Sequence, residues 1–248
     1  ALWRANYGVY GARKLWKAAR RAGIDVGRDQ AARLMRLAGI EGARRRRRAR
    51  AARPDPGGER PADLVERDFT AEEPNKLWVA DPAYVATWAG VAYVCFIVDA
   101  FSRRIVGWRA AAHMRTSMAL DALETARASR GTRLAGLVAH SDAGGQSASL
   151  RWGQRLAELG AAPSVGSVGD SYDNALAETV NGIYKTELIR GPAGGPWRTV
   201  GDVELATLAW VHRHNQQRLH SHLGDLPPAE FEAAYAARRT DHTLVGNQ

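Results

Sequence analysis

Residues 77–98 read LWVADPAYVATWAGVAYVCFIV, and this stretch decides the class of fold. It is rich in β-branched and aromatic residues, which predict β-strands rather than helix. The predicted strands are Leu77–Ala80, Tyr84–Trp88 and Val91–Val98, followed by Arg103–Trp108. Ala89-Gly90 separates the second strand from the third, and Asp81 stands at the end of the first. The segment therefore predicts a meander of antiparallel strands.

Helices and strands alternate after the meander. The predicted elements are a helix at Thr116–Ser129, a strand at Leu134–Ala139, a helix at Leu150–Leu159, a short strand at Ala162–Val165 and a helix at Asp173–Ile189. A run of antiparallel strands followed by alternating strands and helices predicts an α/β fold in which helices flank a mixed sheet.

The net charge of +9 is concentrated near the start of the chain. Residues 1–60 contain 17 Lys and Arg against 5 Asp and Glu, a balance of +12, whereas residues 61–248 contain 18 against 21, a balance of −3. A segment this basic attracts DNA phosphates whatever the base sequence. The predicted DNA contacts are Arg33, Arg36, Arg44, Arg45, Arg46, Arg47 and Arg48. A solvated linker is the alternative interpretation of the arginine run.

Two short helices precede the arginine run. The first is predicted at Gly11–Ala22 and ends at Gly23, and the second follows Asp29 as its N-cap and stops at Gly39. Two short helices joined by a glycine-containing turn fit a helix-turn-helix, whose second helix can enter a major groove of DNA. Periodicity alone also fits an ordinary helical hairpin, and it is the charge that favours DNA binding.

Prolines and glycines between Ala52 and Ala62 predict a domain boundary. The predicted organisation is a basic helix-turn-helix-like domain at 1–53, a linker at 54–68, an α/β core at 69–190 and a helical tail at 191–248.

No apolar run approaches the roughly 20 residues of a membrane-spanning helix, and no signal-peptide pattern opens the chain. We expect a cytoplasmic protein without a membrane partner. The single cysteine, Cys95, excludes an internal disulfide and is predicted to be a core residue, because it lies in an apolar run.

Three carboxylates fall where they can meet. Asp81 follows the first predicted strand, Asp142 comes just after the strand at Leu134–Ala139, and Glu178 lies on a helix. If the two strands are neighbours, both aspartates emerge at one edge of the sheet, and a helix across that edge adds the glutamate. Three acidic oxygen ligands suit Mg²⁺ or Mn²⁺ and leave positions open for phosphate and water. Taken singly, each carboxylate also fits a structural role.

The arrangement resembles that of the retroviral-integrase-like superfamily of transposases, which have an Asp, Asp, 35-residue gap, Glu pattern on a ribonuclease-H-like fold. Here 35 residues lie between Asp142 and Glu178. The matching stretches are Leu77 to Asp81, Asp99 to Trp108, His140 to Asp142, Gly169 to Glu178, Asn215 to His220, Leu223-Gly224 and Pro227 to Glu232. Roughly residues 8–235 are similar to bacterial insertion-sequence transposases whose catalytic part comes from the second of two overlapping reading frames.

The resemblance implies a transposase with an integrase-like catalytic core, which cleaves DNA at insertion-sequence ends and joins the freed 3′-hydroxyl to a second strand. It implies that Asp81, Asp142 and Glu178 are the catalytic residues and bind two Mg²⁺ or Mn²⁺ ions. The implied partners are double-stranded DNA (element ends and target), further copies of the chain in a homo-oligomer, and a protein from the upstream first reading frame. The expected location is then the bacterial nucleoid.

Two departures from the family pattern flank the catalytic positions. Pro82-Ala83-Tyr84 stands where the family has Ile-Thr-Tyr, and the stretch from Ala143 to Ser147 stands where it has Arg-Gly-Ser-Gln-Tyr. Proline cannot donate to a sheet ladder, and the second change removes a cation and an aromatic ring. These changes support the alternative of a catalytically impaired copy that acts only as a DNA-binding protein. A metal-dependent nuclease without strand joining is a second alternative.

Lys185 follows Glu178 by seven residues, two turns of an α-helix, and is predicted to share its face and to contact a DNA phosphate. A solvated lysine is the alternative. The histidines His212, His214, His220 and His222 form two His-x-His pairs that could indicate zinc. We favour a basic helix end instead, because no cysteine is near.

Overall fold

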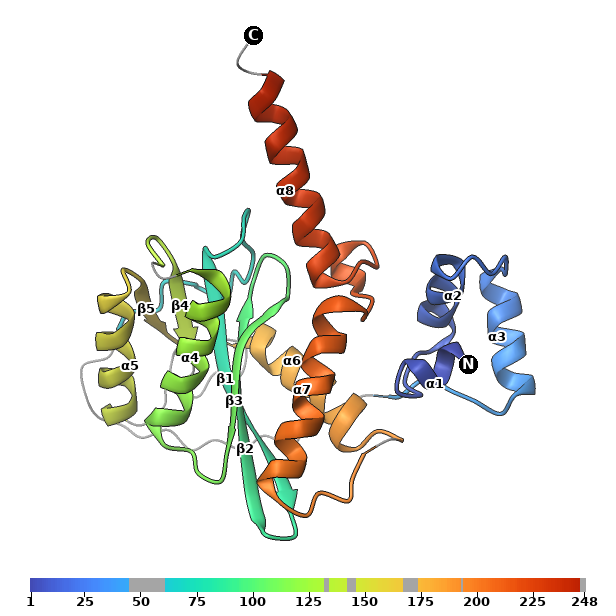
Figure 1. The fold of residues 1–248 in the computed structure, drawn as a ribbon, viewed down its shortest axis with the longest axis horizontal. Coiled ribbons are helices and arrows are strands. Elements are labelled where there is room, and N and C mark those ends of the chain that lie inside the picture. Colours follow the sequence, from blue (N-terminus) through green and yellow to red (C-terminus); the bar gives the residue numbers. More distant parts are fainter. Residues whose placement is uncertain (45–60, 132–133, 142–145, 167–173, 193, 246–248) are drawn as a thin grey trace. The chain divides into compact units, whose positions relative to one another are not determined.

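The computed structural model of the chain describes residues 1–44, 61–131, 134–141, 146–166, 174–192 and 194–245 (Figure 1). The chain divides into two compact units. The sheet unit comprises residues 47–182 and 196–206. The terminal unit comprises residues 1–46, 183–195 and 207–248. The domain boundaries inferred from the sequence stay a prediction.

The sheet unit contains a five-stranded mixed sheet in the order β3-β2-β1-β4-β5. The strands are β1 (Leu77–Thr87), β2 (Gly90–Asp99), β3 (Ile105–Ala111), β4 (Val138–Ser141) and β5 (Ala162–Val165). The first three are antiparallel, whereas β4 pairs parallel to β1 and β5 pairs parallel to β4. The predicted meander followed by an alternating segment is therefore confirmed.

One continuous strand, β1, replaces two predicted ones. The prediction that a strand ends at Asp81 was wrong, because β1 continues through Asp81 and Pro82 to Thr87. Pro82 pairs in register with Cys95 of β2, but the pairing of β1 with β4 stops at Ala80. Beyond Ala80, the β4 side of β1 is an edge among the described residues. An edge tolerates a residue without a backbone N–H, so the fold accommodates Pro82.

The helices of the chain are α1 (Leu2–Ala5), α2 (Ala12–Arg21), α3 (Arg28–Leu37), α4 (Thr116–Arg130), α5 (Gln146–Glu158), α6 (Ala175–Tyr184), α7 (Val200–Gln216) and α8 (Pro228–Val245). A π-helical turn, Lys185–Ile189, follows α6, and a short 3₁₀ helix, Ser221–Leu223, precedes α8. The single α-helix predicted at Asp173–Ile189 thus contains a change of helix type. None of the described helices is long and apolar enough to cross a bilayer.

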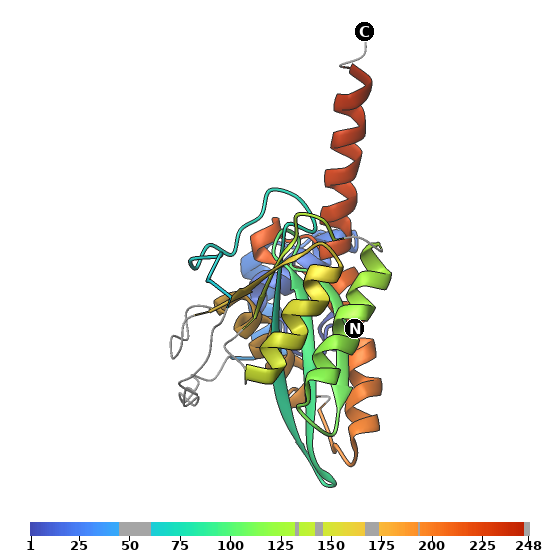
Figure 2. The same cartoon turned by 90° about the vertical axis from the view of Figure 1, so that its left-hand side faces the viewer.

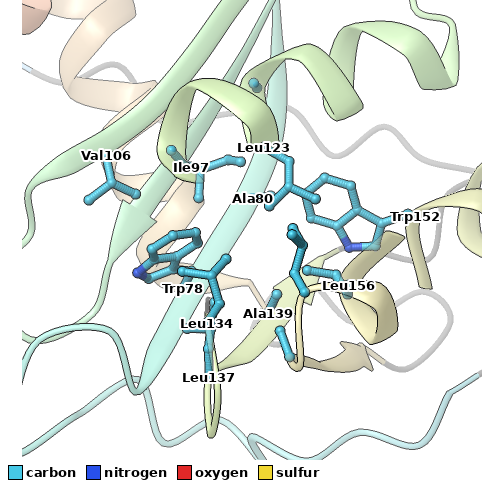
Figure 3. Close-up of a cluster of buried hydrophobic side chains, with 14 of the residues drawn as sticks. Trp78, Ala80, Ile97, Val106, Leu123, Leu134, Leu137, Ala139, Trp152 and Leu156 are labelled. Atoms are coloured by element: carbon cyan, nitrogen blue, oxygen red, sulfur yellow. The ribbon is translucent and has the colours of Figure 1, made fainter. Parts of the chain in front are cut away.

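α4 and α5 lie side by side over one face of the sheet (Figures 1 and 2). A buried cluster fills the space between them and the sheet, and Trp78 and Ala80 of β1 belong to it together with Leu123 of α4 and Leu156 of α5 (Figure 3). Successive side chains of a strand point to opposite faces. Asp81 therefore points to the face opposite α4 and α5.

Cys95 belongs to the same buried cluster, as predicted. Burial raises the pKa of its thiol to about 12, and the nearby Asp81 carboxylate adds to the rise. The thiol therefore stays protonated and apolar in character at neutral pH.

In the terminal unit, α2 and α3 form the predicted pair of short helices. Ala19 of α2 and Ala31 of α3 pack around Val26, which lies in the turn between them. Gly23 has a φ of 74°, which lets the chain reverse directly after α2.

The prediction that Asp29 caps α3 was wrong. The N-cap is Gly27, whose backbone is extended, and Asp29 lies in the first turn instead. A carboxylate in the first turn still interacts favourably with the helix dipole.

Gly107 of β3 lies directly against α4. A Cβ at this position would be 2.2 Å from the carbonyl oxygen of Ala122 and 2.7 Å from the Cβ of Ala126. Only a residue without a side chain permits this approach of helix to sheet.

We predict that Gly107→Ala lowers the free energy of unfolding by about 1–3 kcal/mol, the usual cost of overpacking a core. Urea denaturation of the full chain measures the change. The matched control is Gly153→Ala on α5, where a Cβ would lie 3.7 Å from Pro163 Cγ, an ordinary contact. Because alanine favours helix over glycine by about 1 kcal/mol, this control keeps or raises stability. A Gly107→Ala protein as stable as the parent would contradict the packing described.

Candidate active site

Asp81 lies at the point where the pairing of β1 with β4 ends. Ala80 pairs with Ser141 in the parallel ladder, and these two residues directly precede Asp81 and Asp142 in the sequence. The condition set from the sequence, that the two strands are neighbours, is therefore met. Asp142 itself lies outside the described residues.

Two asparagine side chains attach α6 and its N-terminal flank to β1. Asn181 Nδ2 donates to Asp81 Oδ2 over 2.6 Å, and Asn174 Nδ2 donates to the carbonyl oxygen of Ala80 over 3.1 Å. Both asparagines are buried, and Asp81 is only 9% exposed. The amide of Asn181 therefore holds one oxygen of the Asp81 carboxylate in a fixed orientation.

Glu178 lies three residues before Asn181 on the same helix. Residues three apart share one face of an α-helix, so Glu178 lies on the side of α6 that reaches Asp81. Its backbone N–H donates to the carbonyl oxygen of Asn174 over 3.0 Å, which places it in the first turn of the helix. Its side chain is half-buried rather than enclosed. The fold thus places Glu178 one helical turn from the residue that holds Asp81, although the two acids are 97 positions apart in the sequence.

The donor set at this place suits a hard divalent cation, which prefers oxygen ligands. Asp81 and Glu178 would supply carboxylate oxygens to such an ion. The amide oxygens Oδ1 of Asn174 and Asn181 are buried and have no hydrogen-bond partner among the described residues. Buried polar atoms are rarely left without a partner, and Oδ1 of Asn181, on the same amide that holds Asp81, would be available to a ligand beside the carboxylates.

His140, next to the Ser141 position on β4, is a structural residue. It is fully buried, its Nδ1 lies 2.9 Å from Ser164 Oγ of β5, and the ring of Phe69 contacts it edge-on. Ser164 Oγ also accepts from the backbone N–H of Leu64 over 2.9 Å. These contacts are those of a buried strand histidine whose ring is held by its neighbours.

The predicted DNA contacts differ in exposure. Arg33, Arg36 and Arg44 are exposed, whereas Lys185 is 8% exposed and opens the π-helical turn. The positions from Arg45 to Arg48 lie outside the described residues. The roles of these side chains in DNA binding stay predictions.

The four histidines of the tail separate into two kinds. His212 and His222 are exposed. His214 and His220 are buried, and their ring centroids lie 4.6 Å apart. Burial, with His214 nearby, lowers the pKa of His220, so its ring is neutral.

Sequence reasoning missed Asn174 and Asn181. A signal was present, because Asn174 lies within the stretch Gly169 to Glu178 and Asn181 lies one helical turn after Glu178. It could be used only once α6 was known to lie against β1.

Comparisons with known proteins agree with this geometry. Residues 71–171 and 159–228 match integrase core domain families, and residues 1–48 match an HTH-like domain family. The fold is similar to a chain of the simian T-cell lymphotropic virus intasome, with a TM-score of 0.54 and 18% identity over 72% of this chain and 60% of that chain. It is also similar to the HTLV-2 integrase catalytic core domain in complex with magnesium, with a TM-score of 0.50 and 17% identity over 65% of this chain and 98% of that chain.

The relatives in sequence are transposases. The chain is 55% identical over 239 residues to a putative transposase for insertion sequence element IS986/IS6110 of Mycobacterium tuberculosis, covering 95% of this chain and 85% of that protein. It is 48% identical over 232 residues to the transposase for IS629 of Shigella sonnei, covering 94% and 76%. It is 30% identical over 241 residues to the transposase for IS904 of Lactococcus lactis, covering 94% and 90%.

The integrase core places the protein in the class of DDE-type polynucleotidyl transferases, on a ribonuclease-H-like α/β fold. Within that class, the chain belongs to the insertion-sequence transposases of the DDE integrase superfamily.

We predict that Asn181→Ala raises the metal concentration needed for half-maximal DNA cleavage by about 10- to 100-fold, because residues that orient a metal ligand have effects of this size. Cleavage of a labelled duplex, titrated with Mn²⁺, measures the shift. Asn174→Ala is the matched control, since it removes a similar tie to β1 but no hydrogen bond to the carboxylate, and its midpoint should stay within about 3-fold. Equal shifts in both variants would show that the hydrogen bond to Asp81 has no special role.

Proposed function

We propose that this transposase cuts DNA at the ends of its own insertion sequence and joins the freed 3′-hydroxyl to target DNA, with Asp81, Asp142 and Glu178 as metal ligands. The observation that carries the proposal is the meeting of Asp81 and α6. A buried carboxylate on the central strand is held by Asn181, one helical turn from Glu178. Asp142 lies outside the described residues, and its place in the proposal is supported by Ser141, which directly precedes it and pairs with Ala80.

Mg²⁺ or Mn²⁺, as two ions, would be held by these three carboxylates. When bound, such ions activate the attacking oxygen and neutralise charge on the leaving oxygen of a phosphodiester. Asp81 contributes a preoriented ligand, because Asn181 restrains one of its oxygens. Glu178 contributes a ligand on the more open side of the site, where its half-buried side chain can meet substrate.

The reaction is two in-line displacements at phosphorus. In the first, water attacks the phosphate at the element end, the P–O3′ bond breaks, and a 3′-hydroxyl and a 5′-phosphate result. In the second, that 3′-hydroxyl attacks a target phosphodiester, a new P–O bond forms, and the target 3′-oxygen leaves. No covalent enzyme intermediate is needed, so the protein residues act by orienting the ligands and the DNA.

DNA is held by the terminal unit. α3 exposes Arg33 and Arg36, and Arg44 follows on the same basic segment. The arginines from Arg45 to Arg48 extend this charge along the chain. These side chains bind phosphates, and Lys185 adds a phosphate contact when DNA is in place.

The active assembly is a homo-oligomer that pairs two element ends, and a first-frame protein of the same element joins it. Its place of action is the nucleoid, where both DNA substrates lie. The relatives whose sequences match nearly the whole chain are transposases, and neither these comparisons nor the described structure favours a copy that only binds DNA.

The proposal is tested by strand transfer with labelled DNA taken from the regions flanking the gene, in Mg²⁺ or Mn²⁺. We expect Glu178→Gln to lower the yield of joined products by at least about 100-fold, because a missing metal ligand costs more than a missing neighbour of one. Binding of the end DNA should be retained. Glu158→Gln, at an exposed glutamate of α5, is the control and should match the parent. Nicked but unjoined products from pre-cleaved ends would favour the nuclease alternative, and binding without cleavage would favour the impaired copy.

We predict that replacing Arg33 and Arg36 by alanine weakens DNA binding and reduces the slope of log affinity against log salt, by about 1 for each phosphate that the variant no longer neutralises. Fluorescence anisotropy at several salt concentrations measures both quantities. Arg127→Ala is the control, because Arg127 pairs with Glu124 on α4 and should leave the slope unchanged. An unaltered slope in the double variant would remove α3 from the DNA interface.

A further inference from the structure

Glu187 is a buried acid in the π-helical turn that follows α6. It is 5% exposed, and both of its carboxylate oxygens are held by arginines. Arg213 lies 3.1 Å from Oε2, and Arg218 donates to Oε1 from Nε over 2.9 Å and from Nη2 over 2.8 Å. Burial favours the neutral acid, but Arg218 and Arg213 outweigh it and lower the pKa of Glu187. Glu187 is therefore an anion at neutral pH.

The N-terminal helices complete this cluster. Arg213 Nη2 donates to Asn6 Oδ1 over 3.3 Å, and its guanidinium lies 4.7 Å from the ring centre of Tyr7 and 5.5 Å from that of Tyr10. The hydroxyl of Tyr10 accepts from the backbone N–H of Leu219 over 2.8 Å. One guanidinium thus contacts both Glu187 and the segment that joins α1 to α2.

Three further ion pairs join α2 to the tail of the chain. Arg13 and Lys17 of α2 lie 3.2 and 3.8 Å from Asp225 Oδ2, and Arg21 pairs with Glu230. These three cations are spaced four residues apart, so they occupy one face of α2. That face is directed at the tail, whereas Arg33 and Arg36 of α3 are exposed. The pair of Arg21 with Glu230 is exposed on both sides and contributes little to stability, whereas both arginine contacts of Glu187 are buried.

Local packing supports the π-helical turn. A Cβ at Gly191 would lie 2.1 Å from the carbonyl oxygen of Glu187, so only glycine permits this close return of the chain. π-Helical turns are rare in proteins, and those that do occur are often found at functional sites. Glu187 lies nine residues after Glu178, in the helical run Ala175–Ile189.

We propose that Glu187 is a positioning residue for transposition: through Arg213 and Arg218 it joins the N-terminal DNA-binding helices to the continuation of the helix that contains Glu178. This inference rests on the proposed function. DNA held by α3 is thereby coupled to the catalytic helix, so that cleavage occurs at the element end rather than at any phosphodiester. Glu187 contacts neither DNA nor the reacting atoms. Its contribution is therefore measured by how strongly the protein prefers the element end over other DNA as its substrate.

The test compares two reactions of each variant: strand transfer with the element end, and nicking of a generic duplex in Mn²⁺. Glu187→Gln removes the charge that holds the two arginines. We expect its strand transfer to fall by about 10- to 100-fold, the effect of misplacing reactants from a distance. Generic nicking should stay within about 2-fold, and the Kd for end DNA within about 3-fold.

Glu230→Gln is the control, because it breaks an exposed pair that joins α2 to α8 in the same unit, and it should change strand transfer by less than about 2-fold. Tyr10→Phe is the second variant, should Glu187→Gln fail to fold. It removes only the hydroxyl that accepts from Leu219 and keeps the Glu187 cluster. It should lower strand transfer by about 3-fold without lowering nicking, in line with one hydrogen bond.

Equal reductions of strand transfer and nicking in these variants would mean a merely structural role and would overturn the inference. Parent-like strand transfer in both variants would overturn it as well, while leaving the proposed function intact. Absence of joined products from the parent protein would overturn the proposed function, and this inference with it.

Discussion

Four backbone pairs between β1 and β4, from Leu77 with Val138 to Ala80 with Ser141, join segments that lie 61 residues apart in the chain. The other side of β1 is occupied by β2, so β4 adds on the remaining side. Because the pairing is parallel, Ala80 and Ser141 stand at the same end of the ladder, although β1 itself continues to Thr87. The position of the proposed active site depends on this ladder. Asp81 leaves it on β1, and Asp142 follows its last residue on β4.

The alternation of side chains along β1 then separates structure from chemistry. Trp78 and Ala80 enter the buried cluster beneath α4 and α5, and Asp81 points to the opposite face. On that face α6 is attached by Asn174 and Asn181, whose amides reach Ala80 and Asp81. The same strand thus contributes side chains to the buried core and directs a carboxylate to the opposite face. This explains how a rigid support and a polar site can be only one residue apart.

Charge in the terminal unit has two separate uses. The cations of α2 pair with acids of the tail, and Glu187 is enclosed by Arg213 and Arg218. The cations of α3 remain exposed. Composition predicted a DNA-binding segment from the sum of these charges. Composition could not show which cations pair with acids of the tail and which stay exposed, because ion pairs with residues about 200 positions away are made only in the folded chain.

The sequence by itself determined the class of fold, the candidate carboxylates and the basic DNA-binding segment. Hydrophobic patterning and motif spacing are local properties, and they survive without tertiary contacts. The tertiary structure alone decided that β1 continues through Pro82, because an edge without β4 tolerates proline. It also decided that Asn181 orients Asp81 and that the helix after Tyr184 becomes π-helical around the buried Glu187. Each of these features depends on parts of the chain that meet only on folding. The physical reasons are the end of the β4 pairing beside Pro82, the hydrogen bond between Asn181 and Asp81, and the buried ion pairs of Glu187.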